Sequence, residues 1–467
     1  MNNGFFKGLI TGLGTGLATL LVFWIIGLNG VKNSDAEGEK LALGTASPTP
    51  VVTVAPVITL GPDGNASATG TISDKESAGA EATVTPTVGA SVTETASLTK
   101  TPTPTVTPIP DSDKFTSDSL YDEGFLSKFQ LLGSIMANYY YKDLSESEII
   151  EAVYRNLLDS IGDPYTCYYS PVEYDDLTES SSGTYYGIGA YVSQNIETKI
   201  ITITEPFENG PAYKAGIRAG DVIKKVFDTD VSKMELTDVV AMMKGEEGTE
   251  AVITVYREST DETLTFTVIR SKVDVPTVSA KLLDGNIGYI KVTEFDEVTE
   301  QQFKDAVDSF ESQNVKGLII DLRNNVGGLL NVTVEMADYI LPQADLITYT
   351  LDKYGEGKKY FSDDKHKVDL PIVILVNEYS ASASEVFTGA LKDHGAATVI
   401  GTTTFGKGIV QSVLPITDGS AVKITTSSYY TPSGVCIHGI GIEPDITVTY
   451  TEDDNQLDAA TEYLLGK

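Results

Sequence analysis

The chain has 467 residues, with 66 acidic against 33 basic side chains and a formal net charge of −33. Phosphate binding needs a basic footprint on the protein surface, so this balance argues against a nucleic-acid partner. The length exceeds that of one ordinary domain. The two cysteines, Cys167 and Cys436, lie in different parts of the chain. We therefore expect free thiols and a stability that rests on hydrophobic cores.

The N-terminal segment has the pattern of a membrane anchor. Lys7 precedes an uncharged apolar span from 9 to 28, and about 20 such residues suffice to cross a bilayer as a helix. The basic flank places the N-terminus in the cytoplasm. A cleaved signal peptide is the alternative, with Ala42–Ala46 as a poor and distant cleavage site. We expect residues 1–32 to be a cytoplasmic stub and single-pass anchor in the cell membrane, with the bulk of the chain extracytoplasmic.

Residues 33–115 are rich in Thr, Pro, Ser, Val, Ala and Gly, with repeated Thr-Pro pairs. Such a composition offers too little apolar bulk to offset the entropy of ordering, and its prolines favour an extended spacer. We predict a disordered linker that holds the folded part off the membrane. Residues 116–182 then show helical apolar spacing, for example at Phe125, Phe129 and Leu132. They predict a helical N-terminal region.

Residues 183–271 have the pattern of a separate small domain. Alternating apolar segments at 200–203 and 251–256 predict strands, and the stretch 236–243 predicts a helix. Between the two strands also lies a glycine-rich run, 210–223, which contains Ala-Gly-Asp-Val-Ile.

This segment resembles a PDZ domain, in which a loop of backbone N–H groups holds the terminal carboxylate of a peptide that adds as a strand to a sheet edge. Three interpretations stay open for Arg218 in the glycine-rich run: it contacts the substrate, it stabilises an active arrangement, or it is a solvated loop residue. The resemblance implies a carboxylate loop made of Gly187, Ile188, Gly189 and Ala190.

The chain from 273 onward predicts a mixed α/β domain. After a strand at 287–292 and a helix at 299–312, the apolar run 315–322 is typical of a strand covered on both faces. This strand ends in Arg-Asn-Asn-Val-Gly-Gly, and helical spacing resumes at 329–341. Taken alone, the paired glycines favour a simple strand-to-helix turn. Together with a nucleophile they would let backbone N–H groups approach a developing oxyanion.

A second strand-to-helix turn carries a candidate nucleophile. Residues 371–376 predict a buried strand and residues 383–391 a helix, with Ser-Ala-Ser-Ala-Ser-Glu between them at 380–385. Ser382 at this turn can present its hydroxyl to a cleft beside the helix N-terminus. The competing interpretation is a helix cap built from Ser380 or Ser384 with Glu385.

A candidate base and its orienting group follow in the run 405–411. Serine needs a base, and lysine serves only when neutral, a state that burial favours. Lys407 lies between two glycines and precedes an alternating apolar run, so we expect Lys407, Ile409 and Gln411 to share one strand face. Gln411 would then orient Lys407. A final helix is predicted at 457–465.

Other chemistries fit less well. The run 401–407 matches the first part of a phosphate loop, but Gly408 and a strand-like run follow it where the motif requires Ser or Thr and a helix. The Ser-x-x-Lys match at 97–100 lies in low-complexity sequence without supporting motifs. The three histidines, at 366, 394 and 438, form no triad or zinc spacing, and His394 fits a helix end. We predict no metal and no cofactor.

Four motifs in this order resemble the carboxyl-terminal processing peptidases, also called tail-specific proteases: DLRNNVGGLL at 321–330, SASASE at 380–385, FGKGIVQ at 405–411 and YYTPSG at 429–434. GDPYTCYYSPVEY at 162–174 extends the resemblance upstream, so that it covers about residues 116–467. The resemblance implies Ser382 as nucleophile, Lys407 as general base and Gln411 as its orienting residue. It also implies an oxyanion hole from the amide of Ala383 and one of Gly327 or Gly328.

The expected architecture is a mixed α/β multidomain protein. It comprises the anchor at 1–32, the linker at 33–115, the helical region at 116–182, the PDZ domain at 183–271 and a serine peptidase core at 272–467. In this family the helical region serves as a cap or an association surface. The resemblance therefore leaves open whether the chain forms a homo-oligomer. The expected function is a membrane-anchored extracytoplasmic serine endopeptidase whose partners are proteins with exposed C-terminal tails. The alternative is a non-catalytic PDZ scaffold that binds such tails.

Overall fold

The computed structural model describes residues 115–363 and 366–466. The predicted membrane span, and the predicted linker up to residue 114, lie outside these ranges. Within them, no helix combines the length and the apolar character that a bilayer crossing requires. The described residues form two units, 115–143 and 144–466, which are treated separately below.

The first unit is helical. It contains a 3-10 helix, η2 (Ser117–Leu120), and α3 (Glu123–Tyr139). Asp122 begins α3, because its carboxylate accepts hydrogen bonds from the N–H groups of Gly124 (2.9 Å) and Phe125 (3.1 Å). Such capping satisfies donors that the first helical turn leaves unpaired.

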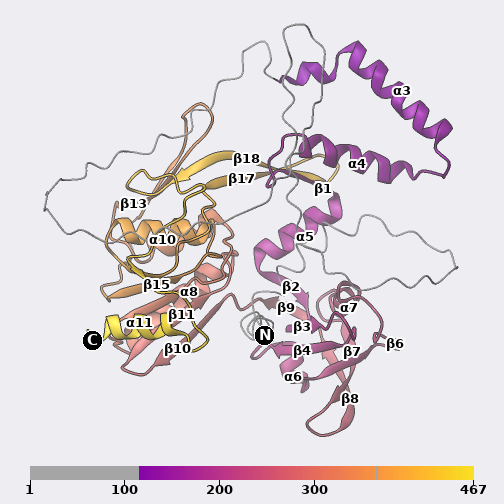
Figure 1. Ribbon diagram of the computed structural model, residues 1–467. Helices are drawn as coiled ribbons and strands as arrows, with labels where there is room; N and C mark the ends of the chain where they lie inside the picture. Colours follow the sequence, from indigo (N-terminus) through magenta and orange to yellow (C-terminus); the bar gives the residue numbers. More distant parts are fainter. Residues whose placement is uncertain (1–114, 364–365, 467) are drawn as a thin grey trace, which may run out of the picture. The chain divides into compact units, whose positions relative to one another are not determined.

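The second unit begins with helices that lead into the predicted PDZ domain. These elements are α4 (Glu146–Asp159), β1 (Cys167–Tyr169) and α5 (Pro171–Ser182). Ser170 and Glu173 form a capping box at the start of α5, a reciprocal arrangement that fixes a helix start. Gly183, with φ of 65°, ends α5, and Figure 1 shows the chain passing directly from α5 into β2. The predicted helical N-terminal region is thus confirmed.

The predicted PDZ domain has its own sheet and its own core. Ile201, Ile203, Ile223 and Ile253 from the strands pack with Val239 from the helix α7 in one buried cluster. Its elements are β2 (Thr184–Gly187), β3 (Ala190–Gln194), β4 (Ile201–Pro206), α6 (Pro211–Ala215), β5 (Val222–Val226), β6 (Thr229–Asp230), α7 (Leu236–Met243), β7 (Glu250–Arg257), β8 (Glu262–Ile269) and β9 (Ser271–Asp274).

Two features of this domain bear on the predicted peptide binding. The sheet order is β3-β4-β5-β7-β8, so β3 lies at an edge of the sheet among the described strands. The strands β2 and β9 pair antiparallel with each other and join the domain to the rest of the unit (Figure 1). The domain is therefore an insertion held by a two-stranded ribbon.

The C-terminal domain is built on a six-stranded sheet of order β10-β11-β12-β15-β16-β19, in which all neighbours after β10 are parallel. The chain links most of these strands through helices, as parallel pairing requires. The elements are β10 (Val278–Leu283), β11 (Ile287–Val292), α8 (Thr299–Ser312), β12 (Leu318–Asp321), α9 (Leu330–Asp338), β15 (Ile372–Val376), α10 (Ala383–Asp393), β16 (Thr398–Gly401), β19 (Ile446–Thr447) and α11 (Asn455–Leu464).

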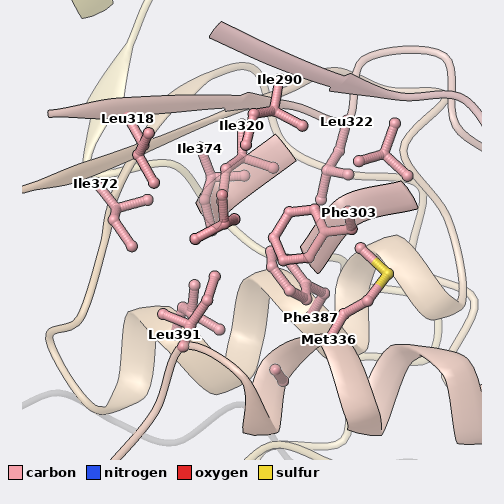
Figure 2. Packing of buried hydrophobic residues seen from close by; sticks show 14 of the residues in the cluster. Ile290, Phe303, Leu318, Ile320, Leu322, Met336, Ile372, Ile374, Phe387 and Leu391 are labelled. Atoms are coloured by element: carbon pink, nitrogen blue, oxygen red, sulfur yellow. The ribbon is translucent and has the colours of Figure 1, made fainter. Parts of the chain in front are cut away.

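Helices cover both faces of this sheet. On one face Phe303 from α8, Met336 from α9 and Phe387 from α10 pack on alternate strand residues such as Ile320 and Ile374; Figure 2 shows these side chains converging. On the other face Ala460 from α11 packs with the intervening residues, Ile319, Val373 and Leu375. This two-sided burial explains the uninterrupted apolar runs of β12 and β15.

A further sheet lies beside this core in the same unit. Its order is β1-β18-β13-β14, with β17 paired to β18. Its remaining strands are β13 (Leu346–Leu351), β14 (Lys359–Phe361), β17 (Ile409–Pro415) and β18 (Ala421–Tyr430). Because β1 pairs with β18, the segment around Cys167 lies against strands that follow the candidate base. The predicted mixed α/β fold is confirmed for the described residues.

The packing of α10 gives a stability prediction. Leu391 on α10 is fully buried, whereas Leu282 on β10 is 51% exposed. We expect Leu391→Ala to lower the free energy of unfolding by about 2–5 kcal/mol, because truncation removes apolar contacts and leaves a cavity. Leu282→Ala, the matched control, should change it by less than about 1 kcal/mol. Urea unfolding of the full-length chain in detergent measures both; equal losses would contradict the assignment of α10 to the core.

Candidate active site

Three loops meet at the carboxyl edge of the parallel sheet. They follow β12, β15 and β16, which are consecutive neighbours, and they carry Gly327, Ser382 and Lys407 respectively. The carboxyl edge of parallel strands is the usual place for a site in such sheets. The first two loops are joined directly, because Ala381 N–H and the Ser384 hydroxyl both donate to the carbonyl oxygen of Asn325, at 3.0 and 2.9 Å.

Ser382 is held in a strained backbone conformation. Its φ is 55° and its ψ is −113°, immediately before α10 begins at Ala383. Non-glycine residues in such conformations persist only where the surrounding structure over-determines them, and they gather at functional sites. The position also puts the hydroxyl at a helix N-terminus, where the dipole favours negative charge.

Glu385 links the nucleophile loop to the lysine loop. Its fully buried carboxylate accepts hydrogen bonds from the backbone N–H groups of Ser382 (2.9 Å), Gly406 (2.7 Å) and Lys407 (2.8 Å). The Thr404 hydroxyl donates a fourth, at 2.6 Å. One side chain therefore fixes the backbone at both catalytic candidates.

Tyr429 on β18 ties the same two positions from the other side. Its hydroxyl contacts the carbonyl oxygens of Ser382, at 2.9 Å, and of Lys407. Burial raises the pKa of Tyr429 well above its ordinary value, and the charge of Glu385 raises it further. The phenol is thus neutral and acts as a hydrogen-bond donor.

Lys407 differs from the predicted placement. It lies in the loop before β17, which begins at Ile409. The register with β18 shifts between Val410 and Gln411, where β18 has the extra residue, Thr426. The prediction that Lys407 shares a strand face with Ile409 and Gln411 was therefore wrong for Lys407, because that residue precedes the strand. The bulge lies in β18 and leaves Ile409 and Gln411 two residues apart on β17.

The surroundings of Lys407 favour its neutral form. Burial lowers the pKa of Lys407, and the charge of Lys423 lowers it further, while Asp163 and Glu385 act in the opposite direction. Its Nζ lies 4.5 Å from the centre of the Tyr165 ring. Among the described residues it makes no hydrogen bond to Ser382 Oγ. The backbone of Ser382 and Lys407 is therefore fixed, whereas the Lys407 side chain has to move for its Nζ to reach Ser382 Oγ.

Gln411 lies on β17, opposite Thr425 of β18. Its side-chain amide donates to Thr425 Oγ1 at 3.4 Å. The structure thus places Gln411 on the strand that follows the lysine loop, with its amide engaged by β18. Its role in orienting Lys407 stays a prediction.

The glycine turn lies directly against the nucleophile. A Cβ built on Gly327 would come within 2.9 Å of Ser382 Cβ and 3.0 Å of Ala383 N, and φ of Gly327 is +111°. Gly327 donates its own N–H to Asn325 Oδ1 at 2.9 Å. Across residues 115–363 and 366–466, the N–H groups of Gly328 and Ala383 meet no acceptor. Of the two glycines, Gly328 is therefore the one whose N–H has no acceptor within the described ranges.

In the predicted carboxylate loop, two carbonyl groups are engaged by the domain. Ile188 O accepts from Ala212 N–H at 2.7 Å, and Gly189 O accepts from Phe207 N–H at 3.0 Å. These bonds hold the loop beside the first turn of α6. Arg218 is exposed and bonds the carbonyl oxygens of Tyr213 and Ile217, at 2.9 and 2.8 Å.

Among the described residues, one cluster of three side chains has the ligand types that metals use, and it lies outside the predicted motifs. The ligand atoms of Asp308, Glu311 and His366 lie within 4.8 Å of one another. His366 also bonds Tyr339 O at 2.7 Å and Glu311 at 3.1 Å, and Tyr339 donates to Asp308. The side chains already satisfy one another, and the absence of a metal site stays a prediction.

Sequence reasoning did not find the roles of Glu385, Tyr429 and Tyr165. A capping signal, Ser-x-x-Glu at 382–385, was present for Glu385, but it indicates only a helix start. The bonds to residues 404–407 follow from the parallel pairing of β15 with β16. For the two tyrosines no local signal exists, because their partners lie on other loops.

Comparison with known proteins agrees with this architecture. Residues 286–448 match the model of peptidase family S41, and residues 202–257 match the model of the PDZ domain. A "Carboxy-terminal-processing protease" of Bartonella bacilliformis is 35% identical over 313 residues, which cover 65% of this chain and 70% of that protein. A "Probable CtpA-like serine protease" of Staphylococcus aureus is 38% identical over 333 residues, covering 70% of this chain.

The aligned part spans 65% of the length of the Staphylococcus aureus relative. Among solved structures, the photosystem II D1 C-terminal processing protease is 30% identical, with 72% of this chain and 91% of that chain covered and a TM-score of 0.42. The chain belongs to peptidase family S41 and carries a PDZ domain. The resemblance to the carboxyl-terminal processing peptidases is thus confirmed.

The bonds of Glu385 give a prediction for the site. In Glu385→Gln an amide NH₂ replaces one acceptor and faces backbone N–H groups, so both catalytic loops lose their alignment. We expect kcat for peptide hydrolysis to fall by at least about 100-fold, and the free energy of unfolding by about 1–3 kcal/mol.

Glu378→Gln is the matched control, because Glu378 is exposed and accepts one bond, from Thr402 Oγ1 at 3.1 Å. Its kcat should stay within about twofold of the parent, as for an ordinary surface substitution. An unchanged kcat in Glu385→Gln, or equal losses in both variants, would contradict the linking role.

Proposed function

We propose that this chain is a serine endopeptidase that captures protein C-terminal tails through its PDZ domain and cleaves the captured chain at Ser382. The observation that carries the proposal is the buried Glu385 carboxylate, which bonds the backbone of Ser382 and Lys407 at 2.9 and 2.8 Å. A serine and a lysine of lowered pKa on two loops so joined are the two groups that such a hydrolysis needs.

The proposed reaction uses only groups of the chain. Neutral Lys407 takes the proton of the Ser382 hydroxyl as Oγ attacks the peptide carbonyl, and then gives that proton to the leaving amine. The acyl-enzyme that results is hydrolysed by water, again with Lys407 as base. The N–H groups of Ala383 and Gly328 stabilise the oxyanion, and Gln411 orients Lys407. Because Nζ rests over Tyr165 in the free protein, substrate binding is expected to bring it to Oγ.

We further propose that the chain is anchored in the cell membrane by residues 9–28 and that its folded part is extracytoplasmic. The support is the uncharged apolar span after Lys7, which has the length of a transmembrane helix and a basic flank on the cytoplasmic side. The proposed substrates are therefore membrane and exported proteins with exposed apolar C-terminal tails.

The nucleophile prediction separates catalysis from binding. We expect Ser382→Ala to lower the cleavage rate of a reporter protein with an apolar tail by at least about 1,000-fold, because no nucleophile remains. Tail binding should persist. Ser412→Ala, a serine on β17 whose hydroxyl bonds Thr426 at 3.0 Å, is the control. Unchanged cleavage by Ser382→Ala would remove the peptidase proposal, and a non-catalytic tail-binding scaffold would then explain the PDZ domain.

The pH dependence of kcat/KM tests Lys407 as the base. Activity should rise with pH as Lys407 loses its proton. Lys423→Met removes a positive charge that lowers the pKa of Lys407, so that pKa rises and the acidic limb moves to higher pH. Asp163→Asn removes a charge that raises this pKa, so the limb moves to lower pH.

The control is Lys199→Met, on the PDZ surface, which should leave the profile in place. The two changes near Lys407 must shift the profile in opposite directions. Shifts of the same sign, or none in either variant, would show that another group sets the acidic limb.

A further inference from the structure

Lys244 lies at the predicted carboxylate loop. It follows the last residue of α7, and its N–H donates to Val240 O at 2.9 Å. A Cβ built on Gly187 would come within 3.7 Å of Lys244 Cα, and Gly245 N–H donates to Tyr186 O at 3.2 Å. The end of α7 therefore packs against the start of the loop, and its lysine places a positive charge there.

Tyr185 shows where that charge lies relative to the loop amides. Its ring fills the space beside Gly187, since a Cβ on Gly187 would meet the ring at 2.8 Å. Lys244 Nζ lies 5.5 Å from the centre of the same ring. Burial raises the pKa of Tyr185 to about 12, while hydrogen bonds from the N–H groups of Ala190 and Gly189 act to lower it. These contacts place the Tyr185 ring beside Gly187, the first residue of the predicted loop, with Lys244 Nζ near the same ring.

A carboxylate of the chain itself is already present at this place. Glu179 on α5 forms an ion pair with Lys244, and its charge also acts on Tyr185. Both side chains of the pair are 37% exposed. A pair this accessible to water contributes little to stability, so a competing carboxylate can replace it.

We propose that Lys244 exchanges one carboxylate for another: it pairs with Glu179 in the free protein and with the terminal carboxylate of a captured tail in the complex. The proposal rests on the tail capture proposed above and adds its regulation. Extended tails add at the free edge of β3, which starts at Ala190, the last residue of the loop. The terminal carboxylate then arrives at the loop amides, beside Lys244.

The exchange has a consequence beyond affinity. Glu179 belongs to α5, whose last turn is bonded to the peptidase core through Glu297 N–H and Ser181 O at 3.1 Å. The Lys244–Glu179 pair therefore connects the PDZ domain to a helix that is held by the core. Capture of a tail releases α7 from α5, and the PDZ domain is then held chiefly by its two-stranded ribbon.

The experiment measures fluorescence anisotropy with full-length Ser382→Ala protein in detergent, which leaves the probe uncut. The probe is a fluorescein-labelled decapeptide that ends in Ala-Val-Val, used as the free acid and as the C-terminal amide. We expect this Ser382→Ala protein, the parent for the variants below, to bind the acid at least tenfold more tightly than the amide. Adding Lys244→Met should reduce that acid-to-amide ratio at least fivefold.

Adding Glu179→Gln should tighten binding of the acid at least twofold and leave the amide unchanged, because the competing carboxylate is gone. In the double variant the Glu179→Gln gain should vanish, since no ammonium remains to be released. The matched control is the ion pair Lys199–Glu235, at 3.1 Å, whose glutamate stands at the opposite end of α7. Lys199→Met and Glu235→Gln should leave the ratio at the parent value.

Two results separate failure of the exchange from failure of tail capture. If the parent binds the acid but Lys244→Met weakens acid and amide equally, or Glu179→Gln does not tighten the acid, the exchange is overturned and tail capture stands. If the parent binds neither form, tail capture fails, and the exchange fails with it.

Discussion

A carboxylate in the interior of the peptidase domain holds the candidate active site together. Burying such a charge without partners costs on the order of several kcal/mol, and Glu385 avoids this cost by accepting bonds from three backbone N–H groups and one hydroxyl. Its place in the first turn of α10 adds the favourable field of the helix N-terminus. These four bonds occupy both oxygens of the Glu385 carboxylate. They therefore hold the Ser382 loop and the Lys407 loop in one position relative to each other.

That constraint explains why strain is tolerated at the nucleophile. Ser382 has a φ that side chains rarely adopt, and Gly401 leaves no room for a Cβ, which would come within 1.9 Å of Val376 O. Gly401 is the last residue of β16, and Ser382 ends the loop that joins the neighbouring strand β15 to α10. The packed core below them contributes the rigidity, so the unfavourable backbone geometry stays concentrated where the chemistry is proposed.

The elements of the peptidase core were predictable because their signals are local. The strand at 287–292 and the helix at 299–312 were predicted with the boundaries that the structure shows, since apolar periodicity there agrees with burial. The placement of Lys407 on a strand was wrong because the alternating pattern that follows it does not mark where the strand begins, and β17 begins only at Ile409. The contact of Lys407 with Tyr165 was unpredictable for a different reason: it joins segments brought together only when β1 pairs with β18.

The way the PDZ domain is inserted makes it suited to report on its ligand. It has a separate core, and β2 and β9 connect it to the peptidase domain as a short antiparallel pair that ends near Gly183, whose carbonyl accepts from Val275 N–H at 2.8 Å. A pair of two strands is marginally stable on its own. Side-chain contacts therefore do much to fix the orientation of the domain. They include the bond of Tyr191 to Pro276 O, at 3.2 Å, and the Lys244–Glu179 pair. A ligand that competes for one of these contacts changes the balance of orientations by its differential affinity alone, which is the condition for coupling a binding domain to a distant reaction.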